Sequence, residues 1–195
     1  MPMGVFAGEL WTGHVVTGQT QDCNIQRFSF QPGEEARYRI SYNWLLLWTD
    51  VGEVWFSAKE SRVKEIPCLH LLAVGATYKS WDWFFKVRNL DLSGCRINDT
   101  IPITLLLDNE IYNIYFRYLG TEKKKIRKLG EIDCMKFSAM LIQGSVFNGG
   151  EKMYIWVTND KNRLPVYIES PILVGSVRGT LIGIKGNRYP LDFRK

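Results

Sequence analysis

The stretch that decides the fold runs Met153-Tyr-Ile-Trp-Val-Thr-Asn-Asp-Lys-Asn-Arg-Leu-Pro-Val-Tyr-Ile-Glu169, followed by Val174-Gly-Ser-Val-Arg-Gly-Thr-Leu181. Residues 154–157 and 166–168 are aromatic or β-branched, which is typical of β-strands. Between them, residues 159–162 supply Asn and Asp side chains that bend a backbone by bonding to it locally. This stretch therefore predicts two strands joined by a polar turn, and then a third strand that begins with a glycine.

Outward from this stretch, short apolar runs recur along the chain and are separated by Gly, Asn and Asp. Further strands are predicted over 36–42, 52–58, 68–74, 101–107, 111–119 and 135–142, with a hairpin turn at 108–110. Residues 43–48 favour a buried strand or an apolar loop over a barrel mouth, and residues 77–87 a short helical turn leading into a strand. No long amphipathic helix or internal repeat occurs. We therefore expect an all-β fold, a curved antiparallel sheet or partial barrel with at most one or two short helices.

A chain of 195 residues is most simply one domain with its own hydrophobic core. Residues 13–22 are polar and rich in Gly and Thr, and residues 1–22 lack the basic and apolar regions of a secretory signal peptide. The sequence thus predicts a flexible N-terminal segment over 1–22 and a single β domain over 23–195. No run approaches the roughly 18 apolar residues that span a bilayer.

The formal net charge of +5 is concentrated in one segment. Five basic residues and no acid lie between positions 123 and 128: Lys123, Lys124, Lys125, Arg127 and Lys128. A nucleic-acid-binding domain usually spreads its charge over a face, so this pattern argues against nucleic acid. Two interpretations stay open, a solvated hairpin end and a loop that contacts anionic lipid headgroups or another acidic partner.

Metal-ligand and catalytic patterns are missing from the sequence. The four cysteines (23, 68, 95 and 134) form no C-x-x-C motif, and His14 and His70 are the only histidines. Cys68-Leu-His70 is too small a cluster to hold a metal on its own. Phosphate-binding glycine motifs are absent, and Gly175-Ser-Val-Arg-Gly179 places its serine beside the first glycine, unlike a nucleophile elbow. The acid pair Glu34-Glu35 lies at a turn, where solvated charge is the default. We expect no metal, no cofactor and no catalytic residues.

Two groups of residues have both a structural and a functional interpretation. Asp160 and Arg163, with Pro165 fixing the exit of the turn, form either a structural clasp or a ligand-binding pair. Five tryptophans lie within about forty residues: Trp44, Trp48, Trp55, Trp81 and Trp83. They form either an aromatic core or the lining of an apolar cavity for a lipid-like ligand.

Several segments together resemble the domain-of-unknown-function family 3108, in the form found in Bacteroidales. The resemblance covers roughly residues 23–190 and is specific only in combination. It is carried by Cys23-Asn-Ile-Gln-Arg-Phe-Ser-Phe-Gln-Pro-Gly-Glu34, Tyr38, Tyr42-Asn-Trp44, Trp48, Gly52, Asp82-Trp-Phe-Phe-Lys-Val-Arg88, Phe147, Trp156-Val-Thr-Asn-Asp160, Arg163-Leu-Pro165 and Gly175-Ser-Val177.

The resemblance implies a periplasmic or secreted bacterial protein that is mostly antiparallel β and has no established activity. Compared with the family, the section after Val87 is shortened, which puts barrel closure in doubt and leaves sheet edges that a homodimer would pair. Our first hypothesis is a non-enzymatic envelope protein that binds an apolar or amphiphilic ligand on a concave aromatic sheet. The alternatives are a structural or protein-interaction module without a small-molecule ligand, and an envelope glycan hydrolase.

Overall fold

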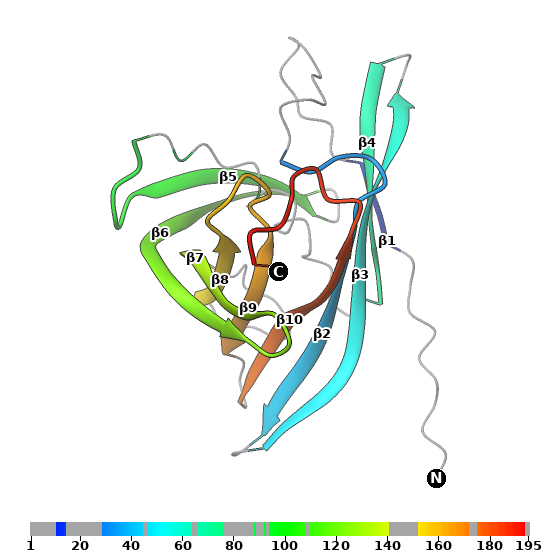
Figure 1. The fold of residues 1–195 in the computed structure, drawn as a ribbon. Coiled ribbons are helices and arrows are strands. Elements are labelled where there is room, and N and C mark those ends of the chain that lie inside the picture. The colour runs from blue at the N-terminus through cyan, green and yellow to red at the C-terminus, as the bar shows by residue number, and fades with distance from the viewer. Residues whose placement is uncertain are drawn as a thin grey trace.

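A computed structural model describes residues 11–14, 29–44, 47–63, 66–75, 88, 92, 94–107, 110–140, 152–171 and 175–193. Its ten strands are β1 (Trp11–His14), β2 (Glu35–Trp44), β3 (Leu47–Val63), β4 (Ile66–Val74), β5 (Thr100–Leu107), β6 (Glu110–Ile126), β7 (Gly130–Met140), β8 (Lys152–Thr158), β9 (Pro165–Pro171) and β10 (Ser176–Lys185). They form one antiparallel sheet in the order β1-β4-β3-β2-β10-β9-β8-β7-β6-β5 (Figure 1). The predicted all-β antiparallel class is confirmed.

Neighbouring strands of the sheet are consecutive in the chain except in two pairings, β1 with β4 and β2 with β10. β2 to β4 form one meander and β5 to β10 form another, and the pairing of β2 with β10 joins the two meanders into one sheet. In Figure 1 the sheet bends strongly, with β5 and β6 on one side and β2, β3 and β4 on the other. No helix long and apolar enough to cross a membrane occurs in the described part of the chain.

The strands predicted from the sequence are present, including the two strands and polar turn of the 153–169 stretch. The alternatives for residues 43–48 were both wrong: β2 ends at Trp44 and β3 begins at Leu47, so that a hairpin divides the segment. Leu47 at this hairpin is 77% exposed. Four residues of the predicted N-terminal segment form β1, which pairs with β4. The helical turn expected over 77–87 lies outside the described residues.

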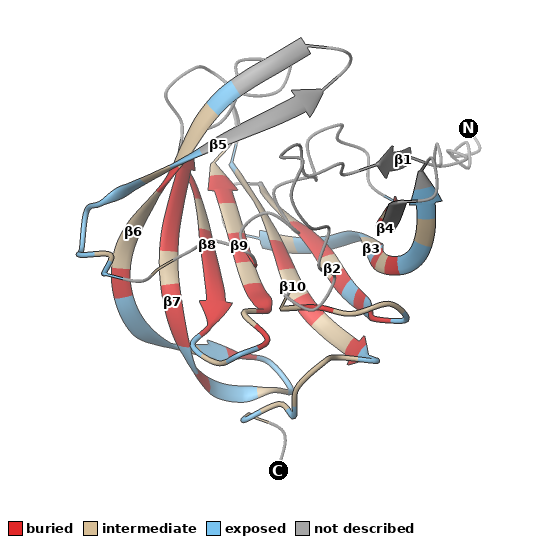
Figure 2. Cartoon of the chain, turned by 90° about the horizontal axis from the view of Figure 1, so that it is seen from above, coloured by how far each residue is buried: buried red, intermediate tan, exposed pale blue. Residues whose placement is uncertain are grey.

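Most of the core lies on one face of the sheet, although Trp156 and Cys134, which the register places on the other face, are buried as well. Every second residue is buried over 36–40 of β2 and over 54–58 of β3, including Tyr38 and Phe56, whose rings meet edge to face at 5.5 Å. Figure 2 shows the buried positions continuing across β7, β8, β9 and β10. Because the sheet curves around this apolar face, we call the opposite face the outer face. It is the face that carries Arg37 and Arg39 between the buried positions of β2.

The third strand of the 153–181 stretch begins as predicted, with Gly175 directly before β10. Its φ of +91° is one that residues with a side chain rarely adopt. A Cβ atom added there would lie 1.8 Å from the carbonyl oxygen of Asn43 on β2. A glycine at this position therefore allows β10 to start close against the end of β2.

Candidate functional site

The tryptophans proposed as a cavity lining do not all fall within the described side chains. Trp81 and Trp83 lie outside the described residues, and of Trp44 only the backbone is described. Trp48 and Trp55 lie on β3, opposite Asn43 and Arg37 of β2 in the register. Since directly opposed residues share a face of the sheet, both tryptophans belong to the outer face rather than to the core face.

Trp48 and Trp55 differ in their surroundings. The guanidinium of Arg178 on β10 lies 3.8 Å from the centre of the Trp48 ring, so that Trp48 is partly covered. Trp55 is 42% exposed, which is unusual for so large an apolar side chain. Together they give the outer face an aromatic region at its β3 end.

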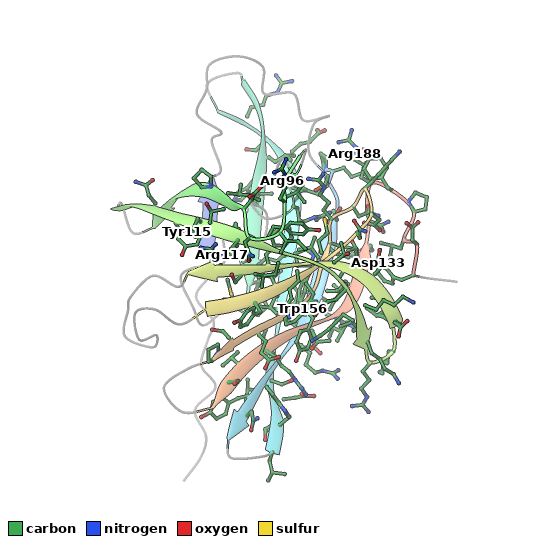
Figure 3. All side chains as sticks on the ribbon, turned by 90° about the vertical axis from the view of Figure 1, so that its left-hand side faces the viewer. Arg96, Tyr115, Arg117, Asp133, Trp156 and Arg188 are labelled. Atoms are coloured by element: carbon green, nitrogen blue, oxygen red, sulfur yellow. The ribbon has the colours of Figure 1, made fainter. Side chains whose placement is uncertain are left out.

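A second aromatic region of the outer face lies on β7, β8 and β9. Lys136, Trp156 and Tyr167 stand directly opposite one another on these three strands. Figure 3 shows Trp156 near the middle of the sheet, away from Arg96 and Arg188. Trp156 and Tyr167 meet edge to face at 5.3 Å, and the ammonium of Lys136 lies 4.8 Å from the indole centre.

β6 adds a second lysine to this region from its second half, which stays paired with β7 as far as Ile126. The pairing of β6 with β7 is irregular between Tyr118 and Gly120, and Gly120 has a φ of +101°. Such a bulge increases the local twist of a strand. As a result, the ammonium of Lys124 reaches over two further strands, 3.8 Å from the ring centre of Trp156 and 4.1 Å from that of Tyr167.

Glu122 of β6 holds the group together. Its carboxylate accepts a hydrogen bond from the indole N–H of Trp156 and lies 3.4 Å from the ammonium of Lys136. The hydrogen bond from Trp156 is the main reason why the pKa of Glu122 is lowered. We call Glu122, Lys124, Lys136, Trp156 and Tyr167 the cation–aromatic cluster.

Lys124 is the most unusual member of the cluster. It is half-buried, and within the described part of the chain no carboxylate lies within ion-pair distance of its ammonium. Burial lowers its pKa, against the more distant charges of Glu169 and Glu122, which raise it. An ammonium on two aromatic rings, partly removed from water, is a site where an anion is attracted more strongly than at the open surface.

The basic segment predicted from the sequence is the end of the β6–β7 hairpin. Lys123 and Lys125 are exposed on β6, and Arg127 and Lys128 are exposed in the turn that follows. Lys123 is paired at 3.0 Å with Glu131. The structure therefore separates Lys124 from its neighbours, since alternate residues of a strand point to opposite faces.

The predicted turn residues meet at the turn between β8 and β9. One carboxylate oxygen of Asp160 accepts hydrogen bonds from the backbone N–H of Asn162 and of Arg163, at 3.0 and 3.1 Å. Pro165 is the first residue of β9, and its carbonyl accepts a 2.6 Å bond from the buried Tyr38 hydroxyl. Asp160 therefore clasps the turn through the backbone of Arg163, which has a φ of +46°.

The interpretation of Glu34 as a solvated acid was wrong. Glu34 is 3% exposed and pairs with the guanidinium of Arg88, which is 1% exposed. Arg88 also donates to the carbonyl of Asn162 at 2.9 Å, and Asn162 in turn bonds the C-terminal segment at Tyr189 and Pro190. This buried network ties together three distant parts of the chain, so we assign it to stability rather than to ligand binding.

Cys134 on β7 lies beside the cluster but is not a reactive thiol. It is fully buried, and burial raises its pKa to about 12. A thiol rather than a thiolate is therefore present at neutral pH, and the thiol is the poorer nucleophile. Among the described side chains, no group of three or more His, Cys, Asp or Glu could hold a metal ion.

Sequence reasoning missed the cation–aromatic cluster and the buried Arg88 network. Both depend on residues that are far apart in the chain. The three partners of the network, Glu34, Arg88 and Asn162, all fall within or beside segments that carry the family resemblance, which was the one signal available.

Comparison with known proteins agrees with that resemblance and adds no activity. No curated protein and no solved structure matches the chain. Residues 96–182, from the turn before β5 to β10, match the family model described as "Protein of unknown function (DUF3108)", and this match supports the family resemblance.

Proposed function

We propose that this protein is a non-enzymatic binding protein for an amphiphilic lipid with an anionic headgroup, and that the headgroup binds at the cation–aromatic cluster. The single observation that carries the proposal is Lys124, whose half-buried ammonium lies on two aromatic rings without a carboxylate within ion-pair distance in the described structure. A phosphate or carboxylate would supply the missing negative charge.

The surroundings of Lys124 favour a ligand that is charged at one end. The exposed cations of the β6–β7 hairpin end (Lys123, Lys125, Arg127 and Lys128) would raise the local concentration of an anion. Trp48 and Trp55 give the same outer face an aromatic region on β3, four strand spacings from Trp156 on β8. At about 4.8 Å per spacing this is roughly 19 Å, the scale of an acyl chain laid across the sheet.

The proposal is tested with vesicles of an anionic lipid, phosphatidylglycerol, and of zwitterionic phosphatidylcholine. The wild-type protein is expected to co-sediment with the anionic vesicles only. Lys124→Gln is expected to weaken this binding about tenfold, which corresponds to roughly 1.4 kcal/mol. Lys125→Gln removes the same charge from the exposed neighbour and is the matched control, with a much smaller expected effect.

The vesicle experiment has two outcomes that contradict the proposal. The first is wild-type binding that does not distinguish the two lipids. The second is an equal loss for Lys124→Gln and Lys125→Gln, because it would reduce the effect to the net charge of the hairpin end. Polar substitution of Trp48 and Trp55 together tests the apolar part of the same site and is expected to weaken uptake of a hydrophobic probe by the folded variant.

We further propose that the protein acts in the bacterial envelope, periplasmic or secreted, as the family resemblance implies. A protein in the bacterial envelope would be next to membranes that contain anionic lipids, the proposed ligand. Fractionation of cells that express the native gene checks this, and recovery of the protein in the cytoplasm alone would contradict it.

A second function, a protein-interaction module that forms a homodimer, is favoured by the ends of the sheet. β5 and β1 each pair with a single strand among those that the structure describes. The free side of an edge strand is a template for pairing with another chain. A native mass spectrum separates the two functions, since a bound lipid supports the first and a lipid-free dimer supports the second.

A further inference from the structure

The end of the β2–β3 hairpin exposes apolar side chains to solvent. Leu47 is 77% exposed and Val51 is 60% exposed. With Trp55 they make up three of the four large hydrophobic residues that the described part of the chain exposes, and all three lie on β3. In the sequence, residues 44–48 read Trp-Leu-Leu-Leu-Trp. Apolar side chains that are exposed in one place mark a surface that contacts a protein or a membrane.

This end of the hairpin projects from the sheet. β10 pairs with β2 as far as Asn43, and β4 pairs with β3 only from Trp55 onward. Residues 47–54 of β3 therefore have β2 as their only partner strand within the described structure. In Figure 1 the ends of β2 and β3 reach below every other strand. We call residues 43–44 of β2 and 47–51 of β3 the hairpin tip.

A cation with unused bonding capacity lies beside the apolar end. The guanidinium of Arg178 on β10 stacks on Trp48 at 3.8 Å, and no described carboxylate lies within ion-pair distance of it. Its Nε is buried without a hydrogen-bond partner in the described structure, and so is the side-chain oxygen of Asn43, the residue opposite Trp48. Buried polar atoms are normally hydrogen-bonded, so a donor and an acceptor left open at one place indicate a polar group from outside the chain. A phosphate suits an arginine of this kind.

Further from the tip, the charges of the hairpin are paired within the protein. The carboxylate of Asp50 accepts a 2.7 Å hydrogen bond from the Ser41 hydroxyl and lies 3.4 Å from the Nε of Arg39. The hairpin thus passes from an apolar end, through the Trp48–Arg178 pair, to internally paired charges. Half a bilayer has the same order, because hydrocarbon is followed by an interface that favours Trp and Arg side chains, and then by water.

From this order we infer that the hairpin tip inserts into the surface of a phospholipid membrane that contains anionic lipids. Leu47 would enter the hydrocarbon, and Trp48 and Arg178 would lie among the headgroups. Addition of a strand from a protein partner is disfavoured, because the register of β2 with β3 shifts and leaves Val51 without a partner in it. A bulge of this kind protects an edge from pairing. The inference goes beyond the proposed function, which places a single lipid headgroup on β6 to β9.

The experiment mixes the full chain with vesicles of phosphatidylcholine and phosphatidylglycerol whose acyl chains carry bromine, a short-range quencher of Trp fluorescence. The wild type is expected to be quenched by these vesicles. Leu47→Asp is expected to weaken vesicle binding at least about tenfold, because a leucine side chain no longer leaves water. Ile97→Asp is the matched control, since Ile97 is 64% exposed before β5 and away from the hairpin, and it should bind as the wild type does. Circular dichroism verifies that each variant is folded.

The role of Arg178 is tested by the choice of lipid. Arg178→Gln is expected to reduce binding to vesicles with phosphatidylglycerol about fivefold, the usual effect of one cation at an anionic membrane surface. Arg96→Gln removes an arginine elsewhere and should have a much smaller effect. Equal losses for the two variants would contradict a headgroup contact of Arg178.

A soluble lipid separates this inference from the proposed function. Dihexanoylphosphatidylglycerol below its micelle concentration offers a headgroup but no membrane surface. Its binding, measured by calorimetry, should be weakened by Lys124→Gln and kept by Leu47→Asp. If it does not bind while quenching still depends on Leu47, the proposed function alone fails. Absence of quenching in the wild type, or equal quenching of the wild type and Leu47→Asp, would overturn the present inference. A dimer that Leu47→Asp dissociates and that binds no vesicles would do the same.

Discussion

Arg88 is the most deeply buried charge that the structure describes, and Glu34 is its partner. Burial raises the pKa of Glu34 above its ordinary value of 4.5, although the Arg88 guanidinium opposes this shift. An acid with a raised pKa holds its proton more tightly in the folded than in the unfolded chain. Its stabilising contribution is therefore complete below pH 4.5 and is lost as the pH rises through the pKa of the folded state.

Glu34→Gln makes this effect measurable, because the amide imitates the protonated acid at every pH. We expect the unfolding free energy of the wild type, relative to Glu34→Gln, to fall as the pH is raised from 4 toward neutrality. Urea unfolding at several pH values measures the difference. Glu35→Gln, which removes the exposed neighbouring carboxylate, is the control. If the unfolding free energy of the wild type, relative to that of Glu34→Gln, instead rises with pH, then the ion pair with Arg88 outweighs the cost of burying the Glu34 carboxylate.

At the scale of the strand, the start of β10 depends on Gly175. Ala at this position would combine an unfavourable φ with a clash against the Asn43 carbonyl. A Gly-to-Ala change stabilises a protein by up to about 1 kcal/mol where the backbone accommodates it, and destabilises by more than that where φ is positive, so we expect Gly175→Ala to reduce the unfolding free energy by more than about 1 kcal/mol. Gly130→Ala is the matched control, since Gly130 has a similar φ of +85° with no atom within 4 Å of the added Cβ. Equal losses for the two variants would show that φ alone matters and the close approach does not.

The strands are also where prediction from sequence succeeded and where it reached its limit. Alternating side chains and turn-forming residues are local signals, so the strands and the turn at Asp160 could be predicted. The face of the sheet on which Trp48 and Trp55 lie depends on their register with β2. The position of Lys124 depends on the irregular pairing of β6 with β7 near Gly120. Nothing in the run of basic residues distinguishes Lys124 from its neighbours. The pairing of Glu34 with Arg88 depends on the whole fold, and the sequence near Glu34 indicates only a turn.

At the scale of the whole molecule, local stability should follow position in the sheet. β8, β9 and β10 have a partner on both sides and carry buried residues such as Ile155 and Val166. β1 and β5 form the two ends of the sheet. Because exchange with solvent follows local opening, we expect amide protons of β8 to β10 to exchange last and those of β1 and β5 first. Hydrogen–deuterium exchange with mass spectrometry measures this order, and protection of β5 equal to that of β9 would indicate that another part of the chain or a second copy covers this end.

The pairing of β2 with β10, which joins the two meanders, forms late when the chain is synthesised from its N-terminus. β2 ends at Trp44, and β10, which pairs with it, begins at Ser176. After the first meander has left the ribosome, five further strands, β5 to β9, must therefore be synthesised before β10, the partner of β2, emerges. During that interval β2 presents an unpaired edge to every other nascent chain, and a chain cut short before Ser176 never loses it. A chaperone that covers this edge of β2 until translation ends would prevent it from pairing with another chain.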